Sequence, residues 1–280
     1  MNYNQILKEG ENFLKKSNIK SPNLDTELIL SKIINKKREE ILLNSKNKLK
    51  NTDLKKFKSY LLRRYHKEPM AYILGYKHFW KHKFLTNKSV LIPRPDTELI
   101  VEETLKHLPI DKSKKILDVG TGSGCIVVSL IKERPKCAAT AIDISRKALN
   151  VAKTNAKLHQ VENKIKFINI DIDKYKSSNY DLIISNPPYI NCIELNRLDD
   201  DIKLHEPKIA LSGGFDGFRD IKKVIVVSKK LLKLNGKLII EIGHKQKNQS
   251  VKILNENGYY INKISKDLAG KDRCIISTKL

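Results

Sequence analysis

The sequence predicts an α/β protein in which a doubly wound, mostly parallel sheet follows a small helical domain. Three observations lead to this class. Apolar residues keep helical spacing up to about residue 67, short strand-like runs alternate with amphipathic helical stretches after Pro93, and a glycine-rich turn follows the first of these strands. Strands separated by helices form right-handed βαβ units, which build a parallel sheet covered by helices on both faces.

The first part of the chain is expected to form helices. Its apolar residues recur every three or four positions, and Ser21-Pro22 is typical of a helix start, where a capping hydroxyl precedes a proline. Short apolar runs between turn residues then predict a hairpin. We therefore divide the chain into a helical domain at 1–72, a linking β-hairpin at 73–92 and an α/β domain at 93–280.

Five short apolar runs in the larger domain are expected to be strands of the parallel sheet. Each is rich in aliphatic residues, and amphipathic helical stretches or turns separate one from the next. The runs are 116–119, 139–142, 165–168, 181–184 and 238–241. In such a sheet the strands' carboxyl ends share one edge, and ligands bind there.

The chain is strongly basic, with 55 Lys and Arg against 31 Asp and Glu and a net charge of +24. A basic surface attracts nucleic acid or acidic proteins. Compositional drift toward lysine explains the same charge, because lysine recurs throughout and no basic stripe with interleaved aromatics is visible. Residues 1–85 hold 20 Lys and Arg and 8 Asp and Glu, so the N-terminal part is the expected docking surface.

Composition predicts neither a membrane segment nor a metal site. No apolar stretch reaches the roughly 20 residues that span a bilayer, and the N-terminus lacks the apolar core of a secretory signal, so a cytoplasmic protein is expected. The four cysteines include no C-x-x-C pair, which argues against zinc or a disulfide framework. His78 and His82 are four residues apart, but they fall in an expected strand that offers no third ligand.

Three strand ends carry residues suited to an adenosine-containing ligand. The turn after the first strand has G-x-G-x-G spacing, which differs from the dinucleotide and triphosphate fingerprints; it consists of Gly120, Thr121, Gly122, Ser123 and Gly124. The second strand ends at Asp143, which can accept hydrogen bonds from both ribose hydroxyls. The third ends at Asp171, placed for the adenine amino group, with Ile172 to cover the ring. Either acid alone is also a common helix cap, but together they indicate S-adenosylmethionine.

The loop after the fourth strand is Asn186-Pro187-Pro188-Tyr189, and it predicts methyl transfer to a planar nitrogen. An amide or amino nitrogen is a poor nucleophile because its lone pair is delocalised, so both N–H bonds must be held while the lone pair turns toward the methyl donor. The Asn186 side-chain oxygen and the Pro187 carbonyl can accept those two bonds. Tyr189 can pack against the flat target group, and no covalent enzyme intermediate is needed.

In these motifs the chain resembles the release-factor glutamine N5-methyltransferases, the HemK or PrmC family. The resemblance extends over nearly the whole chain, and the Pro93-Arg94-Pro95-Asp96-Thr97-Glu98 segment is its most diagnostic part. It also includes Glu68-Pro69, Tyr72-Ile73-Leu74-Gly75, Phe79, the 120–124 and 186–189 loops, Glu206-Pro207, Ala210-Leu211, Gly213-Gly214, Asp216-Gly217, Glu241-Ile242-Gly243 and 267–273.

The resemblance implies an S-adenosylmethionine-dependent enzyme that methylates the glutamine of the Gly-Gly-Gln motif in class I peptide chain release factors, without nucleic acid or metal. It implies a seven-stranded, Rossmann-like sheet whose last hairpin, at about 259–278, is antiparallel to the rest. The helical domain would recognise the factor. Residues 120–124, Asp143 and Asn186 would contact the cofactor, while Asn186, Pro187, Pro188 and Tyr189 would frame the glutamine, and Thr97 and Glu98 would help to close the pocket.

Two other functions are compatible with parts of the sequence. A nucleic-acid amino-methyltransferase acting on adenine N6, cytosine N4 or guanine N2 would use the same loop, but no inserted recognition domain follows Tyr189, and the Asp199-Asp200-Asp201 run would repel phosphates. A non-catalytic nucleic-acid-binding protein would need neither Asn186 nor Asp143.

Overall fold

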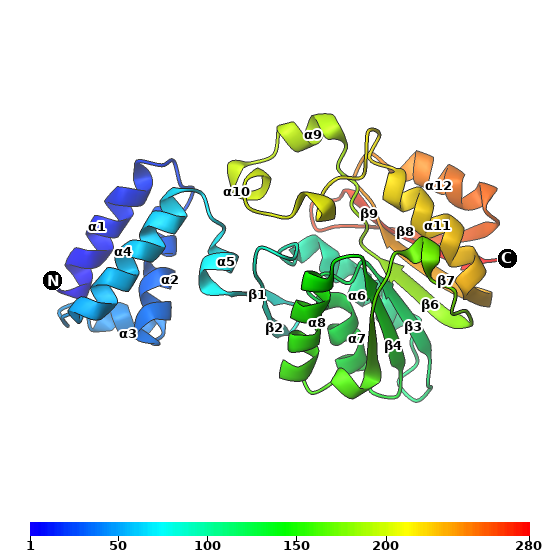
Figure 1. Cartoon of the computed structure of the whole chain (residues 1–280), viewed down its shortest axis with the longest axis horizontal. Coiled ribbons are helices and arrows are strands. Elements are labelled where there is room, and N and C mark those ends of the chain that lie inside the picture. The colour runs from blue at the N-terminus through cyan, green and yellow to red at the C-terminus, as the bar shows by residue number, and fades with distance from the viewer. The chain divides into compact units, whose positions relative to one another are not determined.

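The computed structural model describes all residues from 1 to 280, and the chain folds into two compact units (Figure 1). The helical unit comprises Met1–Tyr76 together with Asp199–His205. The sheet unit comprises Lys77–Leu198 and Glu206–Leu280. None of the helices combines the length and the apolar composition that a membrane-spanning helix needs.

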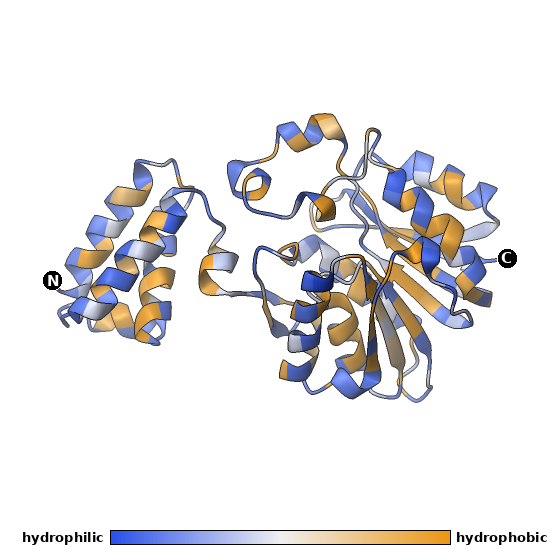
Figure 2. Ribbon diagram, in the orientation of Figure 1, coloured by the Kyte–Doolittle hydropathy of each residue, from blue (hydrophilic) through white to orange (hydrophobic).

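The helical unit is built from amphipathic helices whose apolar sides meet in one core (Figure 2). The first helix begins with a capping box, in which the Asn2 side chain accepts from the Gln5 N–H and the Gln5 side chain accepts from the Asn2 N–H. Ile6, Leu14 and Ile29 are almost completely buried in this core. The expected helical start of the chain is confirmed; the helices are α1 (Tyr3–Lys15), α2 (Pro22–Ile34), α3 (Arg38–Leu43), α4 (Asn51–Tyr65), α5 (Met70–Leu74) and α10 (Asp200–Lys203).

A buried arginine joins three distant parts of the helical unit. The Arg64 guanidinium of α4 pairs with Asp25 of α2 at 2.7 Å and with Asp201 of α10 at 2.7 Å, and it donates to the Glu68 carbonyl at 3.1 Å. Exposed Lys20 pairs with Asp199 at 2.7 Å. The acidic run that we considered as a repellent for phosphates is therefore partly neutralised by these two cations.

The linking hairpin is shorter than predicted. Residues 70–74 form α5, so the strands are only β1 (Tyr76–Phe79) and β2 (His82–Leu85), with Trp80 at the turn in the left-handed region at φ 54°. Residues 86–92 contain no strand. The error arose because short apolar runs do not distinguish a helical turn from a strand. The division at 1–72, 73–92 and 93–280 is retained as a proposal for the folding units.

The sheet unit contains seven strands in the order β5-β4-β3-β6-β7-β9-β8. All five strands expected from the sequence are present, and β3 pairs in parallel with both β4 and β6. The chain runs outward from β3 to β5 and then returns to β6, so the order reverses beside β3. The strands are β3 (Lys115–Val119), β4 (Ala138–Asp143), β5 (Ile165–Asn169), β6 (Tyr180–Ser185), β7 (Leu232–Glu241), β8 (Tyr259–Lys266) and β9 (Asp272–Lys279).

The expectation that the whole last hairpin is antiparallel to the rest was wrong in part. Strand β9 is antiparallel to β7, and β8 is antiparallel to β9. Strand β8 therefore has the same direction as the parallel strands. The two strands of a hairpin must run in opposite directions, so only one of them can oppose the rest of the sheet.

The sheet separates two hydrophobic cores because successive strand residues face opposite sides. Ile116 and Ile184 face the core under α6, α7 and α8, while Leu117 and Ile183 face the core under α11 and α12 (Figures 1 and 2). The helices and 3-10 turns of this unit are α6 (Glu98–Lys106), α7 (Cys125–Glu133), α8 (Arg146–Leu158), α9 (Cys192–Asn196), α11 (Arg219–Leu231), α12 (Lys247–Glu256), η1 (Pro95–Thr97), η2 (Glu162–Lys164), η3 (Ile172–Lys174) and η4 (Lys208–Ala210).

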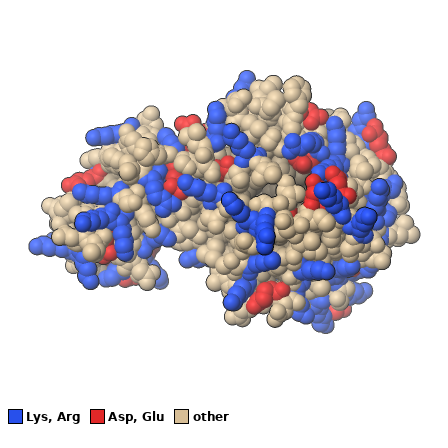
Figure 3. Space-filling view, in the orientation of Figure 1, with Lys and Arg blue, Asp and Glu red and all other residues tan.

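The excess positive charge is distributed over the surface. Lys and Arg side chains are spread over the visible face, with Asp and Glu scattered among them (Figure 3). Their distribution on this face does not form one continuous basic stripe.

Removing the carboxylate beside Arg64 should destabilise the helical unit. Asp25→Ala leaves a buried guanidinium without one of its two carboxylate partners, and breaking a buried ion pair costs about 3 kcal/mol or more. Urea unfolding followed by circular dichroism should show the loss. Lys20→Ala, which breaks the exposed pair with Asp199, should leave the unfolding midpoint unchanged. Equal midpoints for the two variants would contradict a structural role for the Arg64 pair.

Candidate active site

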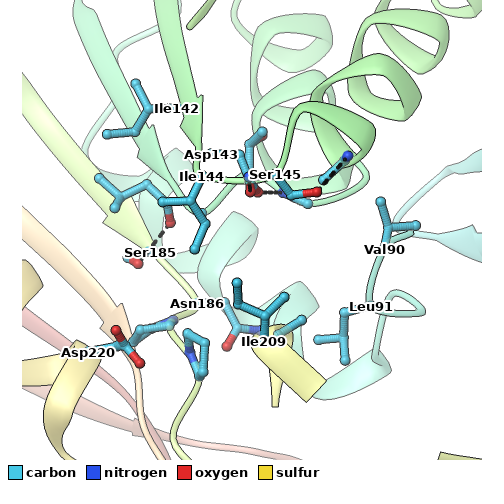
Figure 4. A pocket seen from close by; sticks show the side chains of 18 of the residues that line it. Val90, Leu91, Ile142, Asp143, Ile144, Ser145, Ser185, Asn186, Ile209 and Asp220 are labelled. Atoms are coloured by element: carbon cyan, nitrogen blue, oxygen red, sulfur yellow. Dashed lines mark hydrogen bonds between the residues drawn. The ribbon is translucent and has the colours of Figure 1, made fainter. Parts of the chain in front are cut away.

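A pocket lies at the carboxyl ends of β3, β4, β5 and β6, where the strand order reverses and open α/β sheets bind ligands. In Figure 4, Asn186 and Ile209 lie across the pocket from Asp143, Ile144 and Ser145. Ten of the twelve residues selected from the sequence line it; Gly124 and Tyr189 do not. The ten are Gly120, Thr121, Gly122, Ser123, Asp143, Asp171, Ile172, Asn186, Pro187 and Pro188.

Backbone hydrogen bonds hold the glycine-rich turn against β4. The N–H groups of Gly120 and Thr121 both donate to the Ile142 carbonyl, at 2.9 and 3.1 Å. Gly120 has φ +72°, and a Cβ at this position would meet no protein atom within 4 Å, so it would project into free space at the pocket. Gly124 has a different role, because a Cβ there would lie 3.1 Å from the Ala152 side chain of α8.

Asp143 braces this turn. Its Oδ2 accepts from the Gly122 N–H at 2.9 Å and its Oδ1 accepts from the Ser145 N–H at 2.8 Å. Burial raises the pKa of Asp143, although the two N–H donors oppose that rise. A carboxylate has about four acceptor positions, so lone pairs are left for the hydroxyls of a ribose in the pocket.

Asp171 and Ile172 also line the pocket, where they begin the η3 turn. Asp171 pairs with Lys223 of α11 at 2.8 Å, and its other oxygen caps η3 by accepting from the Asp173 N–H. Ile172 is almost fully buried and can cover a flat ring. The structure places both residues where the sequence predicted them, and adenine recognition by them stays a prediction.

A buried carboxyl that we did not predict lies beneath the turn. Asp118 at the end of β3 is completely buried, and burial raises its pKa to about 7, although the Thr121 hydroxyl donates to its Oδ2 at 2.7 Å. Its Oδ1 has no hydrogen-bond partner. A polar group kept in such an environment costs stability and is common at functional sites.

The Asn186-Pro187-Pro188-Tyr189 loop presents two oxygens that the protein leaves unpaired. The Asn186 amide nitrogen Nδ2 donates to the Thr97 hydroxyl oxygen at 3.0 Å, and no donor in the protein binds its Oδ1. The Pro187 carbonyl likewise accepts no hydrogen bond from the protein. The pocket therefore contains two acceptors of the kind that an –NH₂ group requires.

Close packing fixes the back of this loop. A Cβ on Gly213 would lie 2.8 Å from the Pro188 carbonyl oxygen, and one on Gly217 would lie 2.6 Å from the Tyr189 carbonyl oxygen. Gln246 bridges Tyr189 and Gly217 by donating to both carbonyls. These glycines permit contacts that any larger residue would prevent.

Tyr189 does not line the pocket. Its hydroxyl donates to Oε1 of buried Glu241 at 3.1 Å, and Arg273 donates to the same hydroxyl at 3.5 Å. The structure thus assigns Tyr189 an anchoring contact that the sequence did not reveal. Its packing against a target group stays a prediction.

The segment before α6 covers one side of the pocket and is fastened by Glu206. This buried carboxylate accepts from the Ile92 N–H at 3.1 Å and from Arg94 at 2.6 Å. Thr97 lines the pocket as expected, whereas Glu98 is outside the lining and accepts from the Trp80 N–H at 2.8 Å. Sequence reasoning missed other lining residues, including Ser89, Val90, Leu91, Ile209, Ala210, Arg219, Asp220, Lys223 and Val224.

The residues present fit S-adenosylmethionine. The turn at Gly120 leaves room for close approach, Asp143 offers acceptors for ribose hydroxyls, and no phosphate-binding lysine lies in the turn. No group of three or more His, Cys, Asp or Glu side chains could hold a metal ion.

Comparisons with known proteins agree with this fit. The family model described as "Methyltransferase small domain" matches residues 97–198, and the model described as "PrmC N-terminal domain" matches residues 5–75. A methyltransferase structure from Pyrococcus furiosus superposes with a TM-score of 0.53 at 18% identity, covering 70% of this chain and 88% of that one. The family model and the fold place the larger part of the chain in the class of methyltransferase domains.

Two relatives narrow the class further. A release factor glutamine methyltransferase from Coxiella burnetii is 36% identical over 93% of this chain and 93% of its own length. A bifunctional methyltransferase from Rickettsia felis is 36% identical over 97% of this chain but 57% of its own length, so the chain spans about half of such longer relatives. The chain belongs to the release factor glutamine methyltransferase family.

Asp143→Asn should weaken binding of S-adenosylmethionine about tenfold or more, because an amide cannot accept from both the Gly122 and Ser145 N–H groups and still serve two hydroxyls. Equilibrium dialysis with labelled cofactor measures this affinity. Asp111→Asn is the matched control, since that exposed carboxylate lies outside the pocket. Unchanged affinity in Asp143→Asn would remove Asp143 from the cofactor site.

Proposed function

We propose that this protein transfers a methyl group from S-adenosylmethionine to the side-chain amide nitrogen, N5, of the glutamine in the Gly-Gly-Gln motif of class I peptide chain release factors. Family membership supports the reaction and the substrate class. The single observation that supports the chemistry best is the pair of unpaired acceptors at Asn186 and Pro187. The site of action would be the cytoplasm, where release factors work.

The two acceptors can orient the target amide. Asn186 Oδ1 and the Pro187 carbonyl would each accept one N–H of the glutamine side chain, which leaves the nitrogen lone pair as the remaining direction of attack. Two prolines and the packed glycines Gly213 and Gly217 keep the loop rigid, so this geometry is ready before the substrate arrives.

The rest of the site supports transfer by position and electrostatics. When bound, S-adenosylmethionine supplies a methyl group on a positively charged sulfur. Asp143 and the 120–124 turn would hold its nucleoside and Asn186 would contact both partners of the reaction, while Thr97 and the segment fastened by Glu206 would cover the pocket. We propose no covalent enzyme intermediate, because the nitrogen would attack the methyl group directly as the bond from that methyl group to sulfur breaks, and the nitrogen would lose one of its two protons.

The helical unit is proposed to recognise the release factor. Its match to the PrmC N-terminal model and the basic balance of residues 1–85 support this assignment. Acidic patches on a protein partner would be attracted to such a surface without any requirement for nucleic acid.

Incubation with labelled S-adenosylmethionine and a class I release factor tests the proposal. We expect label on the intact factor and none on a factor whose motif is changed to Gly-Gly-Ala. Asn186→Ala should reduce kcat roughly 10²- to 10³-fold, the usual cost of removing one preorganised hydrogen-bonding group from an active site. Asn150→Ala, an exposed position on α8, should retain the wild-type rate.

Two outcomes would contradict the proposal. Equal labelling of the Gly-Gly-Ala factor would place the methyl group elsewhere on the protein. An unlabelled factor, with label appearing in bulk RNA or DNA, would leave amino-methyl transfer as the chemistry and remove release factor as the substrate.

A further inference from the structure

The contacts of Asn186 alone do not fix the orientation of its side-chain amide. A carboxamide can present either its oxygen or its NH₂ to a neighbour, and only one orientation leaves an acceptor for the substrate. Asn186 directs Nδ2 to the Thr97 hydroxyl at 3.0 Å. A hydroxyl can donate or accept, however, so Thr97 by itself would tolerate the opposite orientation of the amide.

The ambiguity would disappear if the Thr97 hydroxyl donated its own hydrogen to a third group, because its oxygen would then accept from Asn186. Glu241, at the end of β7, lies completely buried beside Thr97, and this hydroxyl acts to lower the carboxyl's pKa. Glu241 Oε1 accepts from Tyr189, whereas Oε2 is buried and has no hydrogen-bond partner. The unsatisfied oxygen needs a donor, and the Thr97 hydroxyl has a hydrogen to give.

Glu241 already accepts one hydrogen bond, from the Tyr189 hydroxyl at 3.1 Å. The charged and titratable groups that face it are Tyr189, Arg273 of β9, Asp96 of η1 and Cys274 of β9. Arg273 is in turn held by Asp267 at 3.0 Å. Burial raises the pKa of Glu241 to about 7, and Thr97, Arg273 and Tyr189 counter that rise.

We infer that Glu241 is a positioning residue that sets the orientation of the Asn186 carboxamide through the Thr97 hydroxyl. When Thr97 donates to Glu241, its oxygen can only accept from Asn186, so Nδ2 faces Thr97 and Oδ1 faces the target nitrogen. The same carboxylate accepts from Tyr189 and so anchors both ends of the 186–189 loop. This inference rests on the proposed function for its role in methyl transfer.

The hydrogen-bond direction can be tested without any methyl acceptor. In protein labelled with ¹⁵N-asparagine, the Asn186 side-chain signals are those missing from Asn186→Ala. We expect their solvent exchange to be slow in the wild type and about tenfold faster in Thr97→Val, which keeps the shape of threonine but accepts no hydrogen bond. Thr97→Ser should restore the slow exchange.

Kinetics test the consequence for catalysis. Glu241→Gln can donate from its amide to Thr97 and so reverse the chain of hydrogen bonds, and Thr97→Val breaks that chain. Both variants should lower kcat about tenfold or more, while KM for the release factor and the affinity for S-adenosylmethionine change less than about threefold. Thr97→Ser should keep kcat within about threefold of the wild type.

These outcomes separate the inference from the proposed function. Unchanged amide exchange in Thr97→Val, or wild-type kcat in both Thr97→Val and Glu241→Gln, would overturn the positioning role. Wild-type enzyme that labels no release factor would overturn the proposed function, and the exchange measurement would still decide on the hydrogen bonds. If one variant fails to fold, as judged by its thermal midpoint, the other isosteric variant carries the test.

Discussion

The parallel pairing of β3 with both β4 and β6 is the constraint on which the rest of the site depends. It brings the ends of three strands to one edge, where Gly120 donates to the Ile142 carbonyl and Ser185 donates to the Val119 carbonyl at 2.9 Å. The 120–124 turn, Asp143 and the 186–189 loop are thereby placed around one pocket, although more than 60 residues separate the first from the last.

Two buried carboxyls lie behind this edge of the sheet, and the burial of each costs folding stability. Burial raises the pKa of Asp118 and of Glu241 to about 7, and each keeps one oxygen without a hydrogen-bond partner. A protein interior normally avoids such groups. Here Asp118 holds Thr121 in the 120–124 turn, and Glu241 lies behind Thr97 and Tyr189. The two buried carboxyls therefore support the 120–124 turn and the 186–189 loop, the two parts of the site that must stay rigid.

Local patterns were enough to predict much of the fold and part of the site. The strands and the glycine turn have short sequence periods or spacings, so all five strands and ten pocket residues were anticipated. Contacts between residues about 90 or more positions apart leave no periodic pattern in the sequence. Three such contacts are the Arg64–Asp201 ion pair, the Thr97–Asn186 hydrogen bond and the hydrogen bond from the Ile92 N–H to Glu206. Strand β8 was misjudged for a related reason, because its direction follows from pairing with β9.

Two free oxygens on a rigid loop are proposed to select a glutamine amide for methylation. Tandem mass spectrometry of a class I release factor after incubation with the enzyme and S-adenosylmethionine tests this most directly. We expect the mass of one added methyl group on the side chain of the glutamine in Gly-Gly-Gln and on no other residue. A methyl group on a backbone atom, on a lysine or on a carboxylate would contradict it.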